Sequence, residues 1–314
     1  MIGPAILVEA PGLLATVQDR GRPGRAAQGI APSGALDRGA LALANRLLGN
    51  TRDAAALEIT MGGFSAVLLP SGGPARGGGQ PGVAPREADE PREPRGLWIA
   101  LTGARGDAEI DGRGFGPNQA VLWPFGTRLR IGMAVAGSRF CLGVRGGVDA
   151  PIVAGSRSSD VLAGLGRPPL APGDALAIAA EVAGPIPAAE PVPWGVTRAL
   201  LEVALAPGPR ADWFAPSASA ALFGEPWLVS NDANRVGMRL LGPALQRVRE
   251  GELPSEGMVV GAVQVPPSGL PTVLLADGPV TGGYPVIAVV AAASLDLLAQ
   301  ARPGERLVFR RALP

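Results

Sequence analysis

Glycine and proline interrupt this chain so often that long helices have little room to form. The 314 residues include 46 glycines and 33 prolines, whereas aromatic residues make up only 4%. Glycine supplies the positive φ angles of tight turns, and proline removes a backbone donor from helices and sheets. Hydrophobic residues still make up 47% of the chain, which is enough to form a core. The composition therefore predicts a mainly β fold with many turns and few short helices.

The chain contains no histidine and a single cysteine, Cys141. Catalysis by Ser-His-Asp or Cys-His groups is excluded, as is any zinc site that needs imidazole, and no metal site is predicted. Cys141 lies in a short apolar run, which predicts a buried, unreactive thiol. The net charge of +1 gives no reason to expect nucleic acid or an anionic membrane as a partner. Without a signal-peptide pattern or an apolar run of 18 residues, the sequence predicts a cytoplasmic protein.

Hydrophobic periodicity predicts many short strands and two helices. Strands are expected at residues 5–8, 13–17, 57–60, 64–69, 97–102, 121–123, 128–131, 139–144, 200–206, 226–229, 261–265, 272–275 and 306–309. A shorter helix is expected at 294–300, with Ser294 as its cap.

The clearer helix lies near the start of the chain. Its beginning is expected at Ser33 or Gly34, and Gly49 ends it as a C-terminal glycine. The residues expected to face the core share a spacing of three to four positions: Leu36, Ala40, Leu43 and Leu47.

Two stretches of unusual composition divide the chain. Residues 71–96 combine glycine, proline and charge with almost no apolar anchor, which predicts a flexible loop. Residues 179–194 are rich in alanine, proline and glutamate, which predicts a linker. We therefore expect an N-terminal β-rich unit at 1–178 and a C-terminal β-barrel unit at 195–314.

A weak internal repeat supports this division. Residues 172–178 and 303–309 each contain a Pro-Gly turn, an acidic residue and a strand, and each closes one half of the chain. The expected architecture is two related β-barrel-like units.

Ser33 lies in the first of three glycine-punctuated polar loops, at residues 16–21 and 31–37. One interpretation makes the loop a pocket wall, where the following helix offers its N-terminal amides to an anion. The other, which is favoured, makes Ser33 only a helix cap.

The second loop, at residues 144–160, contains Arg145, Arg157 and Ser158. Guanidinium groups bind carboxylate or phosphate through paired hydrogen bonds, so the loop is a candidate anion site. An internal salt bridge, Arg157 with Asp160 or Arg145 with Asp149, is an equally good interpretation.

The third region, residues 231–285, alternates polar loops with short apolar strands. In the absence of histidine, its general acid or base candidates are Glu256, Asp277 and Tyr284. Loops that gather at one end of a sheet are a common place for a ligand site. The accompanying substrate or anion contacts are expected from Asn234, Arg235, Gln264 and Thr281.

Short motifs spread in order along the chain carry a family resemblance. They are TVQD (16–19), GRPG (21–24), PSG (32–34), ALEIT (56–60), RGGVD (145–149), GSRS (155–158), NRVG (234–237), SEG (255–257), QVPP (264–267) and TGGYP (281–285). With these motifs the chain resembles the biotin-dependent carboxyltransferase family, also called allophanate hydrolase subunit 2. The C subunits of bacterial 5-oxoprolinases and part of urea carboxylase belong to this family.

The resemblance implies a cyclophilin-like fold of two β-barrel units and a role as one component of a larger enzyme. The first function it implies is ATP-dependent conversion of 5-oxoproline to glutamate. The implied partners are an allophanate hydrolase subunit 1-type protein (the B subunit of 5-oxoprolinase) and the A subunit of 5-oxoprolinase, and the implied cofactor is ATP. The alternatives are carboxyl transfer from carboxybiotin to a urea-like substrate and non-catalytic regulation of a sensor-kinase inhibitor.

The chain departs from the family pattern at two places. Relatives commonly carry histidine in the loop after Gly24, where this chain has Ala26, Ala27 and Gln28. They commonly carry lysine after the Gly-Gly-Tyr-Pro motif, where this chain has Val286. Because a cation is lost there, three arginines are the candidates to take over the anion contact: Arg145, Arg157 and Arg235.

Overall fold

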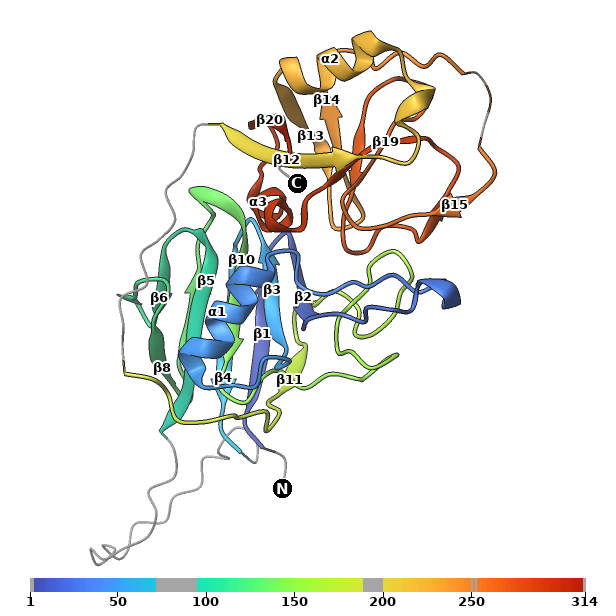
Figure 1. Ribbon diagram of the computed structural model, residues 1–314. Helices are drawn as coiled ribbons and strands as arrows, with labels where there is room; N and C mark the ends of the chain where they lie inside the picture. Colours follow the sequence, from blue (N-terminus) through green and yellow to red (C-terminus); the bar gives the residue numbers. More distant parts are fainter. Residues whose placement is uncertain (1–2, 72–94, 189–199, 250, 252, 313–314) are drawn as a thin grey trace, which may run out of the picture.

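The computed structural model describes residues 3–71, 95–188, 200–249, 251 and 253–312. Within these ranges the chain is mainly β with short helices, as the sequence predicts (Figure 1). Most of the loop expected at 71–96 and the end of the linker expected at 179–194 lie outside the described residues.

The N-terminal half contains two antiparallel sheets. The first has the order β11 (Ala175–Ala177), β1 (Ala5–Pro11), β4 (Phe64–Leu69), β9 (Arg128–Ile131), β6 (Ala108–Ile110) and β7 (Arg113–Gly114). The second has the order β2 (Leu14–Gln18), β3 (Ala56–Thr60), β10 (Ala136–Val144), β5 (Gly96–Arg105) and β8 (Ala120–Pro124).

One apolar core lies between these two sheets. It takes Ile6 and Leu68 from the first sheet and Leu57, Ile99 and Phe140 from the second, all fully buried. Alternate residues of β4 are buried, as expected for strands with one face on a core. The sheet faces turned away from this core are therefore available for other contacts.

The C-terminal half is a closed barrel with a core of its own. Its strands follow the order β12 (Leu201–Pro207), β19 (Val286–Val290), β16 (Ala262–Gln264), β17 (Thr272–Leu274), β14 (Gly237–Leu241), β13 (Trp227–Ala233) and β20 (Arg306–Arg311). A small ribbon of β15 (Glu256–Gly257) and β18 (Thr281–Gly282) lies outside the barrel ladder. The short helical elements of this half are η2 (Ala211–Trp213), α2 (Pro216–Gly224), η3 (Ala292–Ser294) and α3 (Leu295–Gln300).

Helix α1 (Arg38–Leu48) covers the outer face of the second sheet, where it contacts β5 and β10. It follows the short turn η1 (Ala26–Gln28). As predicted, Gly49 ends the helix, and its φ of 62° is left-handed. Of the predicted apolar stripe, Leu36 and Ala40 are buried as expected, whereas Leu41, Ala44 and Leu48 are buried in place of Leu43 and Leu47. The packing is close: a Cβ built on Gly143 of β10 would lie 2.9 Å from the Ala44 side chain.

The predicted start of α1 was also wrong. Asp37, rather than Ser33 or Gly34, caps the helix and accepts a hydrogen bond from the Ala40 amide at 2.7 Å. The helix predicted at 294–300 is confirmed as α3, but the hydroxyl of Ser294 accepts from the Ala204 amide at 3.1 Å instead of capping.

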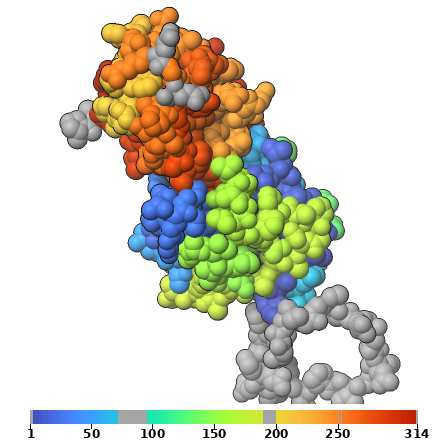
Figure 2. Space-filling view, turned by 90° about the vertical axis from the view of Figure 1, so that its right-hand side faces the viewer, coloured from blue at the N-terminus to red at the C-terminus, as the bar shows by residue number. Residues whose placement is uncertain are grey.

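The two halves meet at α3, which contacts β10 of the N-terminal half and β12 of the barrel. The barrel lies on the end of the N-terminal half in both views (Figures 1 and 2). Residues 181–184 of the expected linker bond to residues 49 and 51 of the N-terminal half. The division of the chain into two domains at 179–194 stays a prediction.

Candidate functional site

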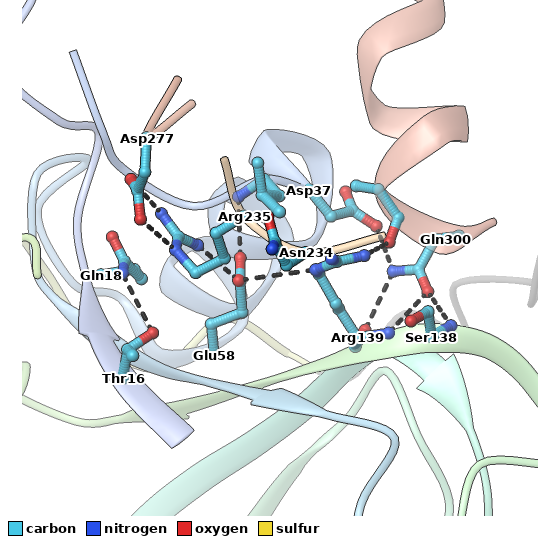
Figure 3. A network of polar contacts seen from close by, with 12 residues as sticks. Thr16, Gln18, Asp37, Glu58, Ser138, Arg139, Asn234, Arg235, Asp277 and Gln300 are labelled. Carbon is cyan, nitrogen blue, oxygen red and sulfur yellow. Dashed lines mark hydrogen bonds and ion pairs between the residues drawn. The ribbon is translucent and has the colours of Figure 1, made fainter. Parts of the chain in front are cut away.

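A charged network is buried where the two halves of the chain meet (Figure 3). Arg235 donates to Asp277 from Nε at 2.8 Å and from Nη2 at 3.0 Å, and to Glu58 from Nη1 at 2.5 Å. Each of the three side chains is at most 3% exposed. Glu58 belongs to β3, whereas Arg235 and Asp277 follow barrel strands β13 and β17. The ion pairs therefore connect the N-terminal half to the barrel.

Arg139 of β10 adds a second cation to this network. Its Nε lies 3.7 Å from Glu58 Oε1, and its Nη1 donates to the Ala299 carbonyl oxygen at 2.5 Å. Burial lowers the pKa of Arg139. Burial also acts against the charge of Arg235, but the carboxylates of Glu58 and Asp277 outweigh it and raise the pKa of Arg235. Two arginines thus face two acidic side chains within this buried network.

Gln300, the last residue of α3, connects the barrel to the N-terminal half through four hydrogen bonds (Figure 3). Its Oε1 accepts from the amides of Ser138 and Arg139 at 2.9 and 3.1 Å. Its Nε2 donates to the Arg139 carbonyl oxygen at 2.9 Å and to Asp37 Oδ2 at 2.6 Å. Three of these hydrogen bonds join the Gln300 side chain to the backbone of β10, so Gln300 holds the end of α3 against that strand.

The N-terminal amides of α1 are occupied by carboxylates of the protein. Asp296 of α3 accepts from the amides of Arg38 and Gly39 at 3.2 Å each, and Asp37 accepts from that of Ala40. Burial raises the pKa of Asp37, although hydrogen bonds from Gln300 and Ala40 partly oppose this. The amides that the sequence offered to an external anion thus bind Asp37 and Asp296.

Ser33 adopts a strained conformation in the wall between the two halves. Its φ is 48°, a left-handed value that is uncommon outside glycine. Its amide donates to the Ala276 carbonyl oxygen at 3.0 Å, and its hydroxyl is buried without a hydrogen-bond partner in the described residues. The turn is tight, because a Cβ on Gly34 would lie 2.8 Å from the Gly21 nitrogen. Strain and an unpaired buried hydroxyl are both typical of functional positions.

A groove of about 1180 Å³ runs beside Ser33 and along α1. The barrel contributes Val260, Leu275 and Leu295 to its wall. Its charged lining consists of four arginines and one acid: Arg20, Arg38, Arg46, Arg52 and Asp296. The groove is therefore apolar in its interior and mainly positive at its charged positions.

The candidate anion loop at residues 144–160 bonds internally instead. Asp19 accepts from the hydroxyls of Ser156 and Ser158 at 2.6 and 2.5 Å and from the amides of Gly21 and Arg157 at 2.7 and 2.6 Å. Ser158 is fully buried in this arrangement. The Asp19 carboxylate thus takes the place that the sequence assigned to an external anion.

The two arginines of that loop are also engaged within the protein. Arg157 pairs with Asp149 at 3.3 Å and Glu181 at 3.1 Å, so the predicted pairing with Asp160 was wrong. Arg145 donates to the carbonyl oxygens of Leu48 and Gly184 at 2.5 and 3.1 Å, and not to Asp149 as predicted. Arg145 closes the C-terminal end of α1 in this way.

The remaining acid and base candidates lie at the β15–β18 ribbon of the barrel. Glu256 of β15 forms an ion pair with Arg210, and this hydrogen bond lowers the pKa of Glu256. Tyr284 follows β18 and is 38% exposed. Burial lowers the pKa of Arg247, and Tyr284 partly opposes this shift. No hydrogen bond or ion pair in the described residues joins Glu256 or Tyr284 to Asp277. Asp277 therefore belongs to the buried junction network, whereas Glu256 and Tyr284 lie at the ribbon.

The expected substrate contacts do not gather at one place. Asn234 is exposed, and its Oδ1 accepts from the amides of Val236 and Gly237, which shapes the turn that carries Arg235. Gln264 belongs to β16 of the barrel, and Thr281 to β18 of the ribbon. The sequence did not identify the partners at the junction as functional: Asp37, Glu58, Arg139, Asp296 and Gln300. One signal was available, because Glu58 is a charged residue in the otherwise apolar strand β3.

No cluster of potential metal ligands occurs in the described residues. No helix in those ranges combines the length and the apolar character needed to cross a membrane.

Comparison with known proteins identifies the class to which this fold and junction belong. The family described as the carboxyltransferase domain, subdomain A and B, matches residues 28–72 and 91–311. The chain belongs to this family, which confirms the resemblance seen in the motifs.

Among individual relatives, the C subunit of 5-oxoprolinase from Escherichia coli (strain K12) is 36% identical over 95% of this chain and 88% of its own length. The solved structure of TTHA0988 is 37% identical with a TM-score of 0.81, covering 98% of this chain. The chain spans only 55% of the length of that protein. The Kluyveromyces lactis urea amidolyase structure has a TM-score of 0.83 at 27% identity, over 100% of this chain and 19% of that protein.

Proposed function

We propose that this chain is the C component of an ATP-dependent 5-oxoprolinase, which converts 5-oxoproline to glutamate with its sister subunits. The observation that carries the proposal is the degree of identity: the chain is 36% identical to the E. coli C subunit but 29% identical to the Saccharomyces cerevisiae urea amidolyase. The proposed partners are an allophanate hydrolase subunit 1-type protein, which is the B subunit, and the A subunit. ATP is the proposed cofactor of the complex.

The β15–β18 ribbon is the proposed place of acid–base chemistry, because Asp277 is held in the buried network. Glu256 stays ionised at neutral pH and can therefore accept a proton, although the hydrogen bond from Arg210 lowers its pKa and makes it a weaker base. The exposed phenol of Tyr284 suits a proton donor or a hydrogen bond to a carbonyl oxygen.

Two arginines near this ribbon are the proposed anion contacts. The Arg210 amide donates to the carbonyl oxygen of Val286 at 3.1 Å, which puts Arg210 beside the position where relatives commonly carry lysine. Arg247 donates from Nη2 to the Val265 carbonyl oxygen, and its Nε is buried without a hydrogen-bond partner in the described residues. Guanidinium groups bind carboxylate and phosphate well; 5-oxoproline carries the first and ATP the second.

Reconstitution with the A and B subunits tests the proposal. We expect ATP hydrolysis that depends on 5-oxoproline, and glutamate release, only when all three proteins are present. Arg247→Gln should lower the turnover of the assembled complex, whereas Arg239→Gln, which alters an exposed ion pair with Asp232, should leave it unchanged. An assembled complex without turnover would disprove the proposed reaction.

A second candidate function is carboxyl transfer from carboxybiotin to a urea-like substrate. The close structural match to urea amidolyase over the whole chain favours it. Incubation with a carboxybiotinylated carrier protein and urea separates the two functions, since only a carboxyltransferase would discharge the carrier.

A further inference from the structure

The groove along α1 carries positive charge that the protein itself does not neutralise. Arg20 pairs with Asp53 at 3.3 Å, and Arg38 pairs with Asp296 at 3.4 Å. The guanidinium groups of the other two groove arginines, Arg46 and Arg52, are exposed and have neither an ion pair nor a hydrogen bond within the described residues. A concave surface with a low dielectric constant strengthens the electric field of these unpaired cations, so the groove attracts acidic groups.

The shape of the groove favours a stretch of polypeptide over a small molecule. The eleven residues of α1 extend for about 16 Å at the helical rise of about 1.5 Å per residue. The volume of about 1180 Å³ exceeds the roughly 300–1,000 Å³ that is usual for small-ligand pockets. Gly39 and Ala42 are exposed along α1 in this groove, and such small residues let a second backbone approach the helix closely.

The charges of the groove also give it a direction. Asp37 and Asp296 already occupy the amides at the N-terminal end of α1. Arg46 lies in the last turn of α1, and Arg52 follows the helix. The first end therefore offers no free amides, whereas the second end offers two unpaired cations, so the acidic part of a bound segment is directed to the second end.

We propose that this groove is the docking site for an acidic, partly apolar segment of the sister B subunit, an inference that rests on the function proposed above. Apolar side chains of that segment contact Ala42, Leu43 and Leu295, while its acidic side chains pair with Arg46 and Arg52. TTHA0988 supports a polypeptide partner, because the matched region is only 55% of that protein, which therefore carries further polypeptide of similar length.

Charge substitution tests the proposal with a matched control. Arg46→Gln with Arg52→Glu removes the two free cations, and glutamine keeps the helix propensity of position 46. Arg113→Gln with Arg306→Glu makes the same change at two exposed positions outside the groove. Calorimetric titration with the purified B subunit should show at least a tenfold rise in Kd for the groove pair and less than a twofold change for the control pair. The wild-type Kd should rise with salt, and that of the groove pair should rise less.

Steric blocking gives a second test that leaves the charge unchanged. Ala42→Trp fills the groove from the exposed side of α1, and Ala220→Trp places the same side chain on the surface of α2 as a control. Only the first should weaken binding of the B subunit, while both keep the thermal unfolding midpoint of the wild type.

The results also distinguish this inference from the proposed reaction. A complex that depends on the groove but lacks 5-oxoproline-dependent ATP hydrolysis supports the docking site and contradicts the reaction. Equal binding of the B subunit by the groove and control pairs, or no binding by the wild type, overturns the docking site. Binding of inorganic pyrophosphate is the last outcome to examine. If only the groove substitutions abolish it, and binding of the B subunit is unchanged, the groove is a small-anion site and the docking proposal is overturned.

Discussion

Asp277 and Glu256 lie in the same half of the chain, and each is paired with an arginine, but their surroundings differ completely. Asp277 is fully buried and accepts two hydrogen bonds from Arg235 at the junction with the N-terminal half. Glu256 and its partner Arg210 have side chains that are 25% and 37% exposed at the β15–β18 ribbon. An arginine–carboxylate pair thus connects the two halves at the junction, whereas a second such pair remains accessible to solvent at the ribbon.

This difference follows from solvation. A buried ion pair is costly to break, because removing one partner leaves the other charged and without water. An exposed pair contributes little to stability, since water solvates either partner alone. Substitutions at the junction should therefore act mainly on folding, and substitutions at the ribbon mainly on activity.

The largest effect is expected for Arg235→Met. Methionine fills a similar volume but leaves the buried Asp277 without its cation and Glu58 with only Arg139, so the free energy of unfolding should fall by about 3–5 kcal/mol. Urea denaturation at pH 7 measures this change. Arg239→Met, which removes an exposed partner of Asp232, is the control and should change the midpoint little. Equal effects of the two substitutions would disprove the contrast between buried and exposed pairs.

Gln300→Ala should have the next largest effect, because it leaves the amides of Ser138 and Arg139 without their acceptor. The expected loss is about 2 kcal/mol of unfolding free energy, measured by the same denaturation. Gln246→Ala, at an exposed position whose side chain has no hydrogen bond in the described residues, is the control.

Gln300→Glu adds a pH test at the same position. It brings a second carboxylate to Asp37, whose pKa is already raised by burial. Repulsion raises the pKa of the pair in the folded state, so stability should be low at pH 7 and partly recovered as the pH falls. A pH-independent loss would show that the two carboxylates do not interact.

The sequence predicted the mainly β fold, α1 and α3 because these depend on local patterns. Apolar periodicity marks each helix, and Gly49 provides the left-handed turn that ends α1. The face of α1 that packs on the sheet was predicted correctly at Ala40 but was one position off in the second half of the helix. Tight packing of Ala44 against Gly143 decides that face, and Gly143 lies far away in the sequence.

The candidate site was harder to predict for the same reason. Arg235 and Asp277 were selected for their residue type, but their partner Glu58 is 177 positions from Arg235 in the sequence. Similarly, Asp19 was available as an acid, yet only the fold brings it to Ser158. Residue type indicates which groups can form ion pairs, whereas the fold determines whether the partner is inside the protein or outside it.

Ser33 provides a smaller test within the junction. Ser33→Gly relieves a positive φ and removes a buried hydroxyl without a partner in the described residues, so the protein should gain up to about 1 kcal/mol in unfolding free energy. Ser33→Ala removes only the hydroxyl and should gain less. If both variants are less stable than the wild type, Ser33 contributes a stabilising interaction and is not strained.

Glu256→Gln should have the smallest effect on stability. Because the hydrogen bond from Arg210 lowers the pKa of Glu256 below its usual value of 4.5, any stabilisation is present above that pH and is lost as the pH falls through the folded-state value. Both partners are well solvated, so the denaturation midpoints of wild type and variant should agree at pH 7 and remain close at a pH of about 3.5. Turnover of the reconstituted complex should fall by about 100-fold or more if Glu256 accepts a proton. A stable variant with full turnover would remove Glu256 from the proposed acid–base pair and leave Tyr284 as its only candidate.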